Sequence, residues 1–295
     1  MKSGIVTIIG RPNVGKSTLI NYLVGEKISI VTPKPQTTRF RILGVKNLPD
    51  VQIVFADTPG FHIAKSALNK YLVNVAVKSL EGADLIYLMA EVNDYIGDEY
   101  PEIFRVLKDL GTQVFLVINK IDLYSSIEIE ETRNQFKSLF NFSEIFEISA
   151  LVGKNVNSLL EKTVAYLPEG PEYFPRDSIT DLPEEIRLSE IIREKAFILL
   201  KKELPYSTAV TMEEITEREN GVLYISAIIH VSKESQKGII IGANGSMIKR
   251  IGTLARIEIE QFLKRKVFLD LRVRVEEDWP KLESKLRKLG YTTLE

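Results

Sequence analysis

The chain contains no cysteine, and this absence excludes several kinds of chemistry. Disulfides, thiolate catalysis and cysteine-built zinc sites all require that residue. Histidine is almost as scarce, because the 295 residues include only His62 and His230, so a histidine-rich metal site is not expected. Long hydrophobic runs are also missing, since no apolar stretch approaches the roughly 20 residues that span a bilayer. We therefore expect a soluble, cytoplasmic protein.

An excess of charge of either sign is missing as well. The sequence has 39 Lys and Arg against 40 Asp and Glu, which gives a net charge of −1. Such a balance argues against bulk electrostatic attraction to nucleic acid. Any binding to nucleic acid must then come from a local basic patch.

The pattern of apolar residues divides the chain into two domains. In residues 1–168, short β-branched runs alternate with amphipathic helical segments, which predicts a mostly parallel α/β sheet with helices on both faces. Residues 169–185 break this periodicity with several prolines and are expected to be a linker. Residues 186–295 follow the order helix, strand, strand, helix, helix, strand, helix, which predicts a small α+β domain.

The expected elements have the following bounds. Strands are predicted at 5–9, 51–56, 84–90, 114–118 and 145–148, and in the second domain at 208–215, 223–231 and 267–275. Helices are predicted at 17–24, 68–80, 99–110, 127–140, 156–167, 189–203 and 280–289, with two further helical pieces flanking 242–245.

A phosphate-binding loop joins the first strand to the first helix. Residues Gly10, Arg11, Pro12, Asn13, Val14, Gly15, Lys16 and Ser17 match the pattern G-x-x-x-x-G-K-[ST], and Thr18 follows directly. In such a loop, backbone N–H groups and the helix N-terminus surround a phosphate. Lys16 would reach the β- and γ-phosphates and Ser17 would hold Mg²⁺. A turn that matches by chance is disfavoured, because strand and helix are both in register.

Three stretches at strand ends narrow the ligand to a guanine nucleotide. The run Asp57-Thr58-Pro59-Gly60 places a carboxylate opposite Ser17, where it would hold Mg²⁺ through water, and the Gly60 N–H would sense the γ-phosphate. In Asn119-Lys120-Ile121-Asp122, the last residue can accept from guanine N1–H and N2–H₂. A buried carboxylate that adenine leaves unpaired costs several kcal/mol.

The same base site takes further residues from two loops. Asn119 would brace the loop and contact the base, and the Lys120 stem would cover the face of the base. The run Ser149-Ala150-Leu151 follows the last strand and would offer the Ala150 N–H to guanine O6.

Together these motifs resemble the GTPases of the translation-factor class, specifically the Era-like family. The resemblance also includes Thr37-Thr38-Arg39, and it implies GTP or GDP and Mg²⁺ as ligands. In that family a threonine of the segment before the second strand closes on Mg²⁺ in the GTP state. Here the segment is Glu26–Phe40. We favour Thr38 for this role, and Thr37 is the alternative. A long mobile loop suits a γ-phosphate switch.

Catalysis follows a different pattern from that of Ras-like enzymes. Phe61 stands where those enzymes carry the water-positioning glutamine, and phenylalanine cannot orient water. The resemblance implies slow hydrolysis unless it is assisted, with Asn13 recruiting K⁺ beside the phosphates. Lys16, Thr38 and Gly60 complete the expected catalytic set. His62 is interpreted as a solvated loop residue rather than a general base.

A second glycine loop, Gly242-Ala243-Asn244-Gly245, lies near the C-terminus between an apolar run and Ile248-Lys249. This apolar-G-x-x-G-x-x-I-K pattern resembles that of the KH RNA-binding domain in its α-β-β-α-α-β version. A single-stranded backbone of about four nucleotides could lie against such a loop, because no side chains intervene. The expected RNA-binding residues are Lys237, Ile240, Ile241, Gly242, Ala243, Asn244, Gly245, Lys249, Arg250 and Ile251, with bases on a groove formed by the three isoleucines. The alternative is a structural turn beside core isoleucines.

A GTPase domain followed by a KH domain resembles the Era-like family along essentially the whole chain. This implies a GTP-hydrolysing switch that binds the 3′ region of 16S ribosomal RNA and assists 30S subunit assembly, with a coupling to cell growth or division as a further hypothesis. We expect a monomer. Two alternatives remain open: a non-catalytic RNA-binding scaffold with GTP as a structural ligand, and a switch peripheral on the inner membrane. The membrane contact would be the final helix, with Lys281, Lys285, Arg287 and Lys288 among Leu282, Leu286 and Leu289.

The substitution Asp122→Asn tests the reading of the base. An asparagine amide donates where the carboxylate accepted, so it matches the C2 carbonyl of xanthine instead of the guanine amino group. We expect GTP affinity to fall roughly 100-fold or more and XTP affinity to rise, as measured by competition binding. Unchanged GTP affinity would contradict the assignment.

Overall fold

The computed structural model describes residues 1–62 and 66–292. The chain forms two compact units, which divide along the sequence between Asp181 and Leu182. This division falls within the stretch 169–185 that the sequence predicts to be a linker.

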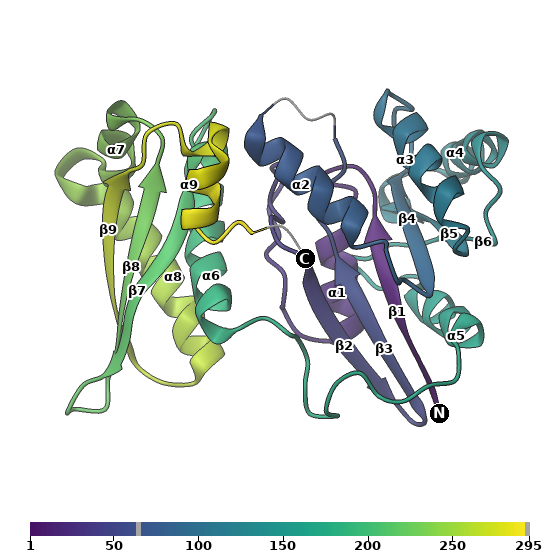
Figure 1. Ribbon diagram of the computed structural model, residues 1–295, viewed down its shortest axis with the longest axis horizontal. Coiled ribbons are helices and arrows are strands. Elements are labelled where there is room, and N and C mark those ends of the chain that lie inside the picture. Colours follow the sequence, from purple (N-terminus) through teal and green to yellow (C-terminus); the bar gives the residue numbers. More distant parts are fainter. Residues whose placement is uncertain (63–65, 293–295) are drawn as a thin grey trace. The chain divides into compact units, whose positions relative to one another are not determined.

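The first unit is built on a six-stranded sheet with the order β2-β3-β1-β4-β5-β6 (Figure 1). All neighbouring strands are parallel except β2, which runs antiparallel to β3. The strands are β1 Lys2–Ile9, β2 Ile42–Leu48, β3 Val51–Asp57, β4 Leu85–Glu91, β5 Val114–Asn119 and β6 Glu144–Glu147. The helices are α1 Lys16–Val24, α2 Ala67–Lys78, α3 Glu99–Leu110, α4 Ser126–Leu139 and α5 Val156–Tyr166, with a short 3₁₀ turn η1 at Ile121–Leu123. The mostly parallel sheet predicted from the sequence is confirmed.

Helices cover both faces of this sheet. On one face, Ile86 and Leu88 of β4 lie in a core with Tyr100 and Phe104 of α3 and Phe136 of α4. On the other face, the alternate residue Tyr87 hydrogen-bonds Thr163 of α5. A strand buried on both faces needs apolar residues throughout, which explains the continuous apolar run of β4.

Strand β2 was not expected from the sequence. Its run is interrupted by Gly44, where a Cβ atom would lie 2.7 Å from a methyl of Val24 and 2.6 Å from Ile28. The glycine therefore allows α1 and the chain after it to approach the edge of the sheet closely.

The parallel strands end at one edge of the sheet and bring the predicted motifs together there. In the register, Ile8 of β1 stands beside Asp57 of β3, and Glu91 of β4 stands beside Asn119 of β5. Ligands of open α/β sheets bind outside these carboxyl ends.

Part of the predicted linker lies along the outer edge of β2. The Val45 N–H donates to Ile179 O over 2.9 Å, and Gly44 forms a β-bridge with Thr180. The Asp181 carboxylate accepts from the Leu43 N–H over 3.0 Å. This stretch therefore shields an edge strand, whose unpaired backbone groups would otherwise be open to other chains.

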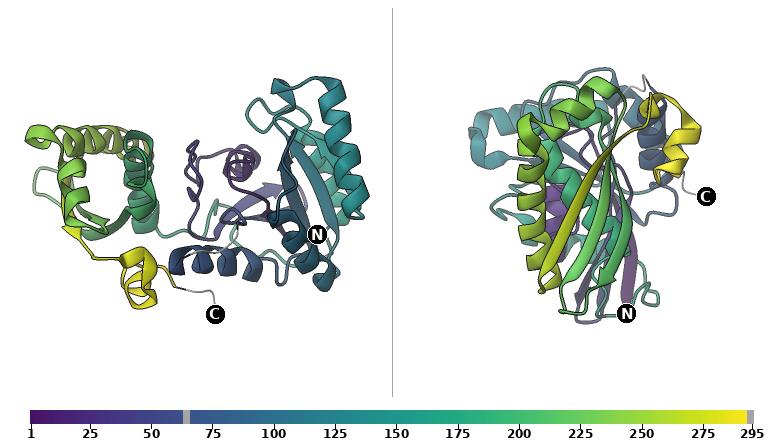
Figure 2. Two further views of the ribbon diagram at one scale, coloured as in Figure 1. Left: turned by 90° about the horizontal axis from the view of Figure 1, so that it is seen from above. Right: turned by 90° about the vertical axis from the view of Figure 1, so that its left-hand side faces the viewer.

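The second unit is a three-stranded sheet whose one face is covered by the helices between residues 184 and 263 (Figure 2). Its strands are β7 Ala209–Glu217, β8 Leu223–Val231 and β9 Val267–Val275; β8 pairs antiparallel with β7 and parallel with β9. The helices are α6 Glu184–Leu199, α7 Glu234–Ile241, α8 Ser246–Leu263 and α9 Glu283–Lys288, with 3₁₀ turns η2 at Pro205–Ser207, η3 at Ala243–Gly245 and η4 at Trp279–Lys281. The predicted element order is confirmed. Helix α6 begins five residues before the predicted start, directly after Pro183, with two glutamates in its first turn.

Gln52 ties the stretch after α5 to β3. It is fully buried; its amide donates to Asn47 Oδ1 over 2.9 Å and to Phe174 O over 2.8 Å, and its oxygen accepts from the N–H groups of Tyr173 and Phe174. These bonds satisfy backbone groups that would otherwise have no partner in this buried position.

The substitution Gln52→Leu should destabilise the first unit by about 2–4 kcal/mol, because it leaves several buried polar groups unpaired. Urea denaturation measures the loss, and limited proteolysis should show faster cleavage within residues 169–181. Gln135→Leu, on the exposed side of α4, is the matched control and should change the unfolding free energy by less than about 0.5 kcal/mol. Equal stabilities of the two variants would refute this role.

Candidate functional site

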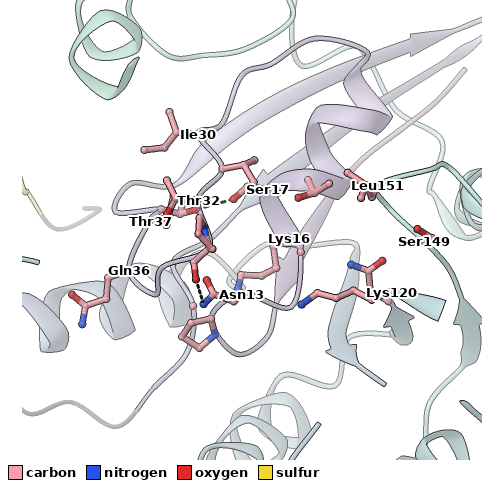
Figure 3. A pocket seen from close by; sticks show the side chains of 18 of the residues that line it. Asn13, Lys16, Ser17, Ile30, Thr32, Gln36, Thr37, Lys120, Ser149 and Leu151 are labelled. Atoms are coloured by element: carbon pink, nitrogen blue, oxygen red, sulfur yellow. Dashed lines mark hydrogen bonds between the residues drawn. The ribbon is translucent and has the colours of Figure 1, made fainter. Parts of the chain in front are cut away.

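A cavity of about 480 Å³ lies at the carboxyl ends of the strands of the first unit. The predicted residues that line it are Pro12, Asn13, Gly15, Lys16, Ser17, Thr18, Thr37, Thr38, Gly60, Asn119, Lys120, Asp122, Ser149 and Leu151. Figure 3 shows Lys16 and Ser17 between Thr32 and Thr37 on one side and Lys120, Ser149 and Leu151 on the other. The structure therefore brings together residues from all four predicted motifs and from Glu26–Phe40.

The phosphate loop is packed closely against its neighbours. At Gly15, φ is 105° and a Cβ atom would lie 2.3 Å from Asn119 Nδ2. At Gly10, a Cβ atom would lie 2.2 Å from the carbonyl oxygen of Met89. Only glycine fits at these two positions, so the loop can hold its backbone N–H groups around a phosphate.

Lys16 lies inside this loop. Its Nζ donates to Gly10 O over 3.0 Å and to Arg11 O over 2.8 Å. Burial lowers the Lys16 pKa from its ordinary value of 10.5 to about 8, and the negative charges of Asp57 and Asp94 partly oppose this shift. In the part of the chain that the structure describes, this ammonium bonds neutral carbonyl oxygens, so it is well placed to move onto an anionic phosphate.

Three predicted metal-binding side chains meet at one carboxylate oxygen. Ser17 Oγ donates to Asp57 Oδ2 over 2.7 Å, Thr38 Oγ1 lies 3.4 Å from the same oxygen, and the two hydroxyls are 2.9 Å apart. Asp57 is fully buried, and its Oδ1 has no hydrogen-bond partner in the described chain. Burial raises the Asp57 pKa, while hydroxyl donors and Lys16 oppose the rise.

These residues fit Mg²⁺. The ion prefers oxygen ligands and retains several waters, so one carboxylate and two hydroxyls are an ordinary protein contribution. In the part of the chain that the structure describes, no group of three or more His, Cys, Asp or Glu side chains could hold a metal. The Thr37 hydroxyl faces Thr32 Oγ1 and Lys34 O instead of Asp57, so the geometry favours Thr38 over Thr37.

The segment Glu26–Phe40 contacts the phosphate loop through Asn13. The Asn13 amide donates to Pro33 O over 3.0 Å. Besides Thr37 and Thr38, which the sequence predicted, the residues of this segment that line the cavity are Ile30, Val31, Thr32, Pro33 and Gln36. Nothing in their residue types marks them as a site, and only their position before the second motif could have suggested it.

Asn119 joins the phosphate loop to the loop after β6. Its amide donates to Val14 O over 2.8 Å, and its oxygen accepts from the Ala150 N–H over 2.8 Å. The bracing role predicted for Asn119 matches this geometry. A guanine O6 would have to share the Ala150 N–H with Asn119.

The premise of a buried carboxylate at Asp122 is wrong. Asp122 is exposed, in the 3₁₀ turn η1, so desolvation can come only from the base that covers it. Leu123 and Leu151 are 69% and 76% exposed and line the same cavity. Leu123 was missed in the sequence, although its place next to Asp122 is a usable signal. Two exposed leucines beside one carboxylate suit a flat base with a polar edge.

Several predicted nucleotide-site residues do not line the cavity: Gly10, Arg11, Val14, Asp57, Thr58, Pro59 and Ala150. Arg11 donates to Asp94 Oδ1 over 2.6 Å and to Tyr95 O, and the Thr58 hydroxyl donates to Ile8 O over 2.7 Å. Phe61 is buried in the core beside α3, which agrees with its lacking a role in orienting water. His62 is half-buried rather than freely solvated, with Nδ1 2.8 Å from Gly60 O.

The second glycine loop lies between α7 and α8. Gly242 has φ 74° and Gly245 has φ 76°, with Asn244 also left-handed at 51°. A Cβ atom at Gly242 would lie 2.8 Å from the Met247 backbone nitrogen. The turn therefore needs its glycines for backbone reasons too, and Ala243 and Asn244 at its tip are exposed.

The predicted groove of Ile240, Ile241 and Ile251 is wrong. Ile240 and Ile251 are fully buried in the core of the second unit, and Ile241 is only half-buried. Helical periodicity explains the error: Ile251 shares its face of α8 with core residues, whereas Ile248 and Gly252 lie one turn apart on another face. A groove of about 270 Å³ lies there, lined by Ile248, Lys249, Gly252, Thr253, Arg256, Leu269 and Leu271.

The basic residues near the glycine loop differ in availability. Lys249 and Arg250 are exposed, and within the described chain neither forms an ion pair. Lys237 lies 3.8 Å from Glu234, and Arg256 lies 3.4 Å from Glu260. Lys249 and Arg250 are therefore the better placed to meet phosphates.

The final helix offers little to a lipid surface. Leu286 and Leu289 are buried, and Lys285 and Lys288 pair with Glu276 over 3.3 and 2.9 Å. Among residues 1–62 and 66–292, no helix combines the length and the apolar character needed to cross a membrane.

The Lys16 pKa predicts how stability depends on pH. Below about pH 8 both states are charged, so the cost of burying the ammonium is fully present. Between about pH 8 and 10.5 the unfolded chain keeps a proton that the folded chain has lost, so stability rises with pH. In nucleotide-free protein, we expect the unfolding free energy of wild type to rise by about 3 kcal/mol relative to that of the Lys16→Met variant across this pH window. Urea denaturation at a series of pH values measures both. A constant difference between the two proteins would contradict it.

Comparisons with known proteins agree with this arrangement. Residues 5–120 match the family model described as 50S ribosome-binding GTPase, and residues 203–280 match the KH domain model. GTPase Era of Geobacter metallireducens is 51% identical over 99% of this chain and 98% of its own length, and that of Geotalea daltonii is 48% identical over 98% and 97%.

Two solved structures resemble the whole chain, each with a TM-score of 0.95 and 42% identity. One is Era in complex with MgGDPNP and nucleotides 1506–1542 of 16S ribosomal RNA, and coverage is 99% of both chains. The other is a single-residue variant of Aquifex aeolicus Era bound to GDP·AlF₄⁻, with coverage of 99% of this chain and 100% of that one. This chain therefore belongs to the Era family of GTPases, with a GTPase domain followed by a KH domain.

Proposed function

We propose that this protein is a GTP-hydrolysing switch that binds the 3′ region of 16S ribosomal RNA through its KH domain and assists assembly of the 30S subunit. The proposal rests mainly on one observation. The hydroxyls of Ser17 and Thr38 both lie next to one carboxylate oxygen of Asp57, beside a cavity that Asp122 lines. The solved relatives with a magnesium-bound GTP analogue, an RNA fragment and GDP·AlF₄⁻ support it.

In this proposal the phosphate loop binds the nucleotide phosphates and Lys16 moves from its two carbonyl partners onto them. Ser17 and Thr38 would hold Mg²⁺ directly and Asp57 through water; the ion would neutralise charge between the β- and γ-phosphates. Because Thr38 belongs to Glu26–Phe40, its contact with the metal would order that segment in the GTP state. Gly60 would sense the γ-phosphate through its backbone N–H. Loss of the γ-phosphate would release both segments and, with them, the RNA.

Hydrolysis would depend on charge compensation rather than on a glutamine. Asn13 has a left-handed backbone, with φ 66°, and lines the cavity; its amide nitrogen donates to Pro33 O, which leaves its amide oxygen to act as a cation ligand in this proposal. We propose that it helps to hold K⁺ there, where a cation would offset the charge that develops in the transition state. The rival is a non-catalytic scaffold that uses GTP only as a structural ligand.

Phosphate release under multiple turnover separates these two functions. Wild type should release more phosphate in K⁺ than in Na⁺ at equal ionic strength, and Asn13→Ala should lose most of that difference, with GDP affinity changed by less than about fivefold. A chain that binds GTP but never turns over, in either salt and with RNA present, would favour the scaffold.

We propose that the RNA backbone lies along the loop 242–245 and that bases enter the groove of Ile248, Gly252, Leu269 and Leu271. Ile248 of α8 and Leu269 and Leu271 of β9 supply apolar surface on the two sides of the groove, and Lys249, which also lines it, supplies positive charge together with the neighbouring Arg250. A glycine loop and an apolar groove of this kind hold about four unpaired nucleotides.

The surface of the inner membrane is an alternative location at which the protein could act. Binding there would rest on the final helix, where Leu282 is the leucine that stays substantially exposed. Liposome co-sedimentation of the full-length protein is the relevant measurement.

The substitution Gly252→Val should fill the groove, because a Cβ atom there would already lie 3.4 Å from Leu271. We expect a roughly tenfold loss of affinity for a single-stranded 16S 3′-end RNA, with GTP affinity unchanged. Gly238→Val is the matched control: that glycine is also helical, but it is exposed and has open space around its Cβ position. Equal losses in both variants would place the RNA elsewhere.

A further inference from the structure

A third hydroxyl, which none of the sequence motifs contains, also binds the Asp57 carboxylate. Ser29 Oγ donates to Asp57 Oδ2 over 2.7 Å, the same distance as the bond from Ser17. Ser29 is almost fully buried and does not line the cavity. It therefore has no route to the nucleotide except through Asp57.

The position of Ser29 is fixed by Asn21 of α1. The Asn21 side-chain oxygen accepts from the N–H groups of Ile28 and Ser29, each over 2.9 Å, and its amide donates to Ser29 O over 2.7 Å. One side chain thus holds both backbone groups of Ser29. Because Asn21 stands on the helix that begins at the phosphate loop, Ser29 is tied to the rigid part of the site.

The three residues that donate to Asp57 have different further roles in the proposed function. Ser17 and Thr38 are shared with Mg²⁺ in the proposed function, whereas Ser29 is not a proposed metal ligand. Ser29 and Thr38 both belong to Glu26–Phe40, but Asn21 fixes the Ser29 backbone to α1, and we infer that Ser29 stays in place when the part of the segment that carries Thr38 is released. A buried carboxylate that loses a donor is less firmly oriented, and among residues 1–62 and 66–292 the Asp57 Oδ1 has no hydrogen-bond partner.

We propose that Ser29 is a positioning residue that holds the Asp57 carboxylate in place for Mg²⁺ whether or not Thr38 is engaged. This inference rests on the proposed function, because it assumes that Asp57 supports the metal. Its consequence is greatest in the GDP state, where Thr38 is released and Ser29 and Ser17 alone orient the carboxylate. The residue would thus contribute to keeping Mg²⁺ and GDP bound between rounds of hydrolysis.

The test is the Mg²⁺ dependence of GDP release from the full-length protein, followed with a fluorescent GDP analogue over a series of Mg²⁺ concentrations and in EDTA. For Ser29→Ala we expect that about tenfold more Mg²⁺ is needed to slow release, since a hydrogen bond to a charged group is lost. Affinity for GDP in EDTA should stay within about twofold of wild type. Asn21→Ala should shift the Mg²⁺ dependence in the same direction.

Two controls interpret the result. Ser79→Ala removes a hydroxyl that is equally buried but bonds Val75 O, so it should leave the Mg²⁺ dependence unchanged. Ser17→Ala tests the proposed metal site itself. If Ser17→Ala weakens Mg²⁺ binding and Ser29→Ala does not, the inference about Ser29 is overturned while the proposed function stands. If neither does, the metal assignment is wrong. A parallel loss of GDP affinity in EDTA for Ser29→Ala would show a merely structural role.

Discussion

The buried carboxylate of Asp57 is the constraint on which the rest of the nucleotide site depends. An isolated charge in such a position is costly, and it is tolerated only when donors or a cation compensate it. Here the donors come from α1, from the start of Glu26–Phe40 and from its end, so one side chain collects three separate parts of the chain. A cation bound beside Asp57 would therefore contact the segment that carries Thr38 directly.

Close packing around glycine is the second constraint, and it acts in both units. In the first, Gly10 and Gly15 let the phosphate loop lie against Met89 and Asn119, so the loop is held by strand ends β4 and β5. In the second, Gly242 lets the chain turn tightly from α7 into α8. In each case the proposed binding surface is the backbone, because no side chain fits at these glycine positions.

The sequence predicted most elements and their order, because apolar periodicity and motif spacing are local signals. It missed β2, whose run is broken by Gly44, a residue required by contact with α1 that no local pattern records. It placed all predicted Mg²⁺ side chains together, since Ser17 and Asp57 lie at the carboxyl ends of parallel strands and Thr38 precedes β2, which begins at the same edge because it runs antiparallel to β3. The prediction from sequence failed where the burial of a residue decides its role. Asp122 is exposed, Ile240 and Ile251 belong to the core, and the buried Ser29 lies in none of the motifs. Burial depends on tertiary packing, which a single sequence does not record.

The central claim is that one chain reads guanine nucleotide in one unit and RNA in the other, with the first controlling the second. Crosslinking the full-length protein to total ribosomal RNA in the presence of Mg²⁺, with a non-hydrolysable GTP analogue or with GDP, and sequencing the bound fragments tests it most directly. The account predicts crosslinks at the 3′ end of 16S ribosomal RNA, through residues near 242–256, that are several-fold more abundant with the analogue. Crosslinks of equal abundance in both nucleotide states, or spread evenly over the RNA, would contradict it.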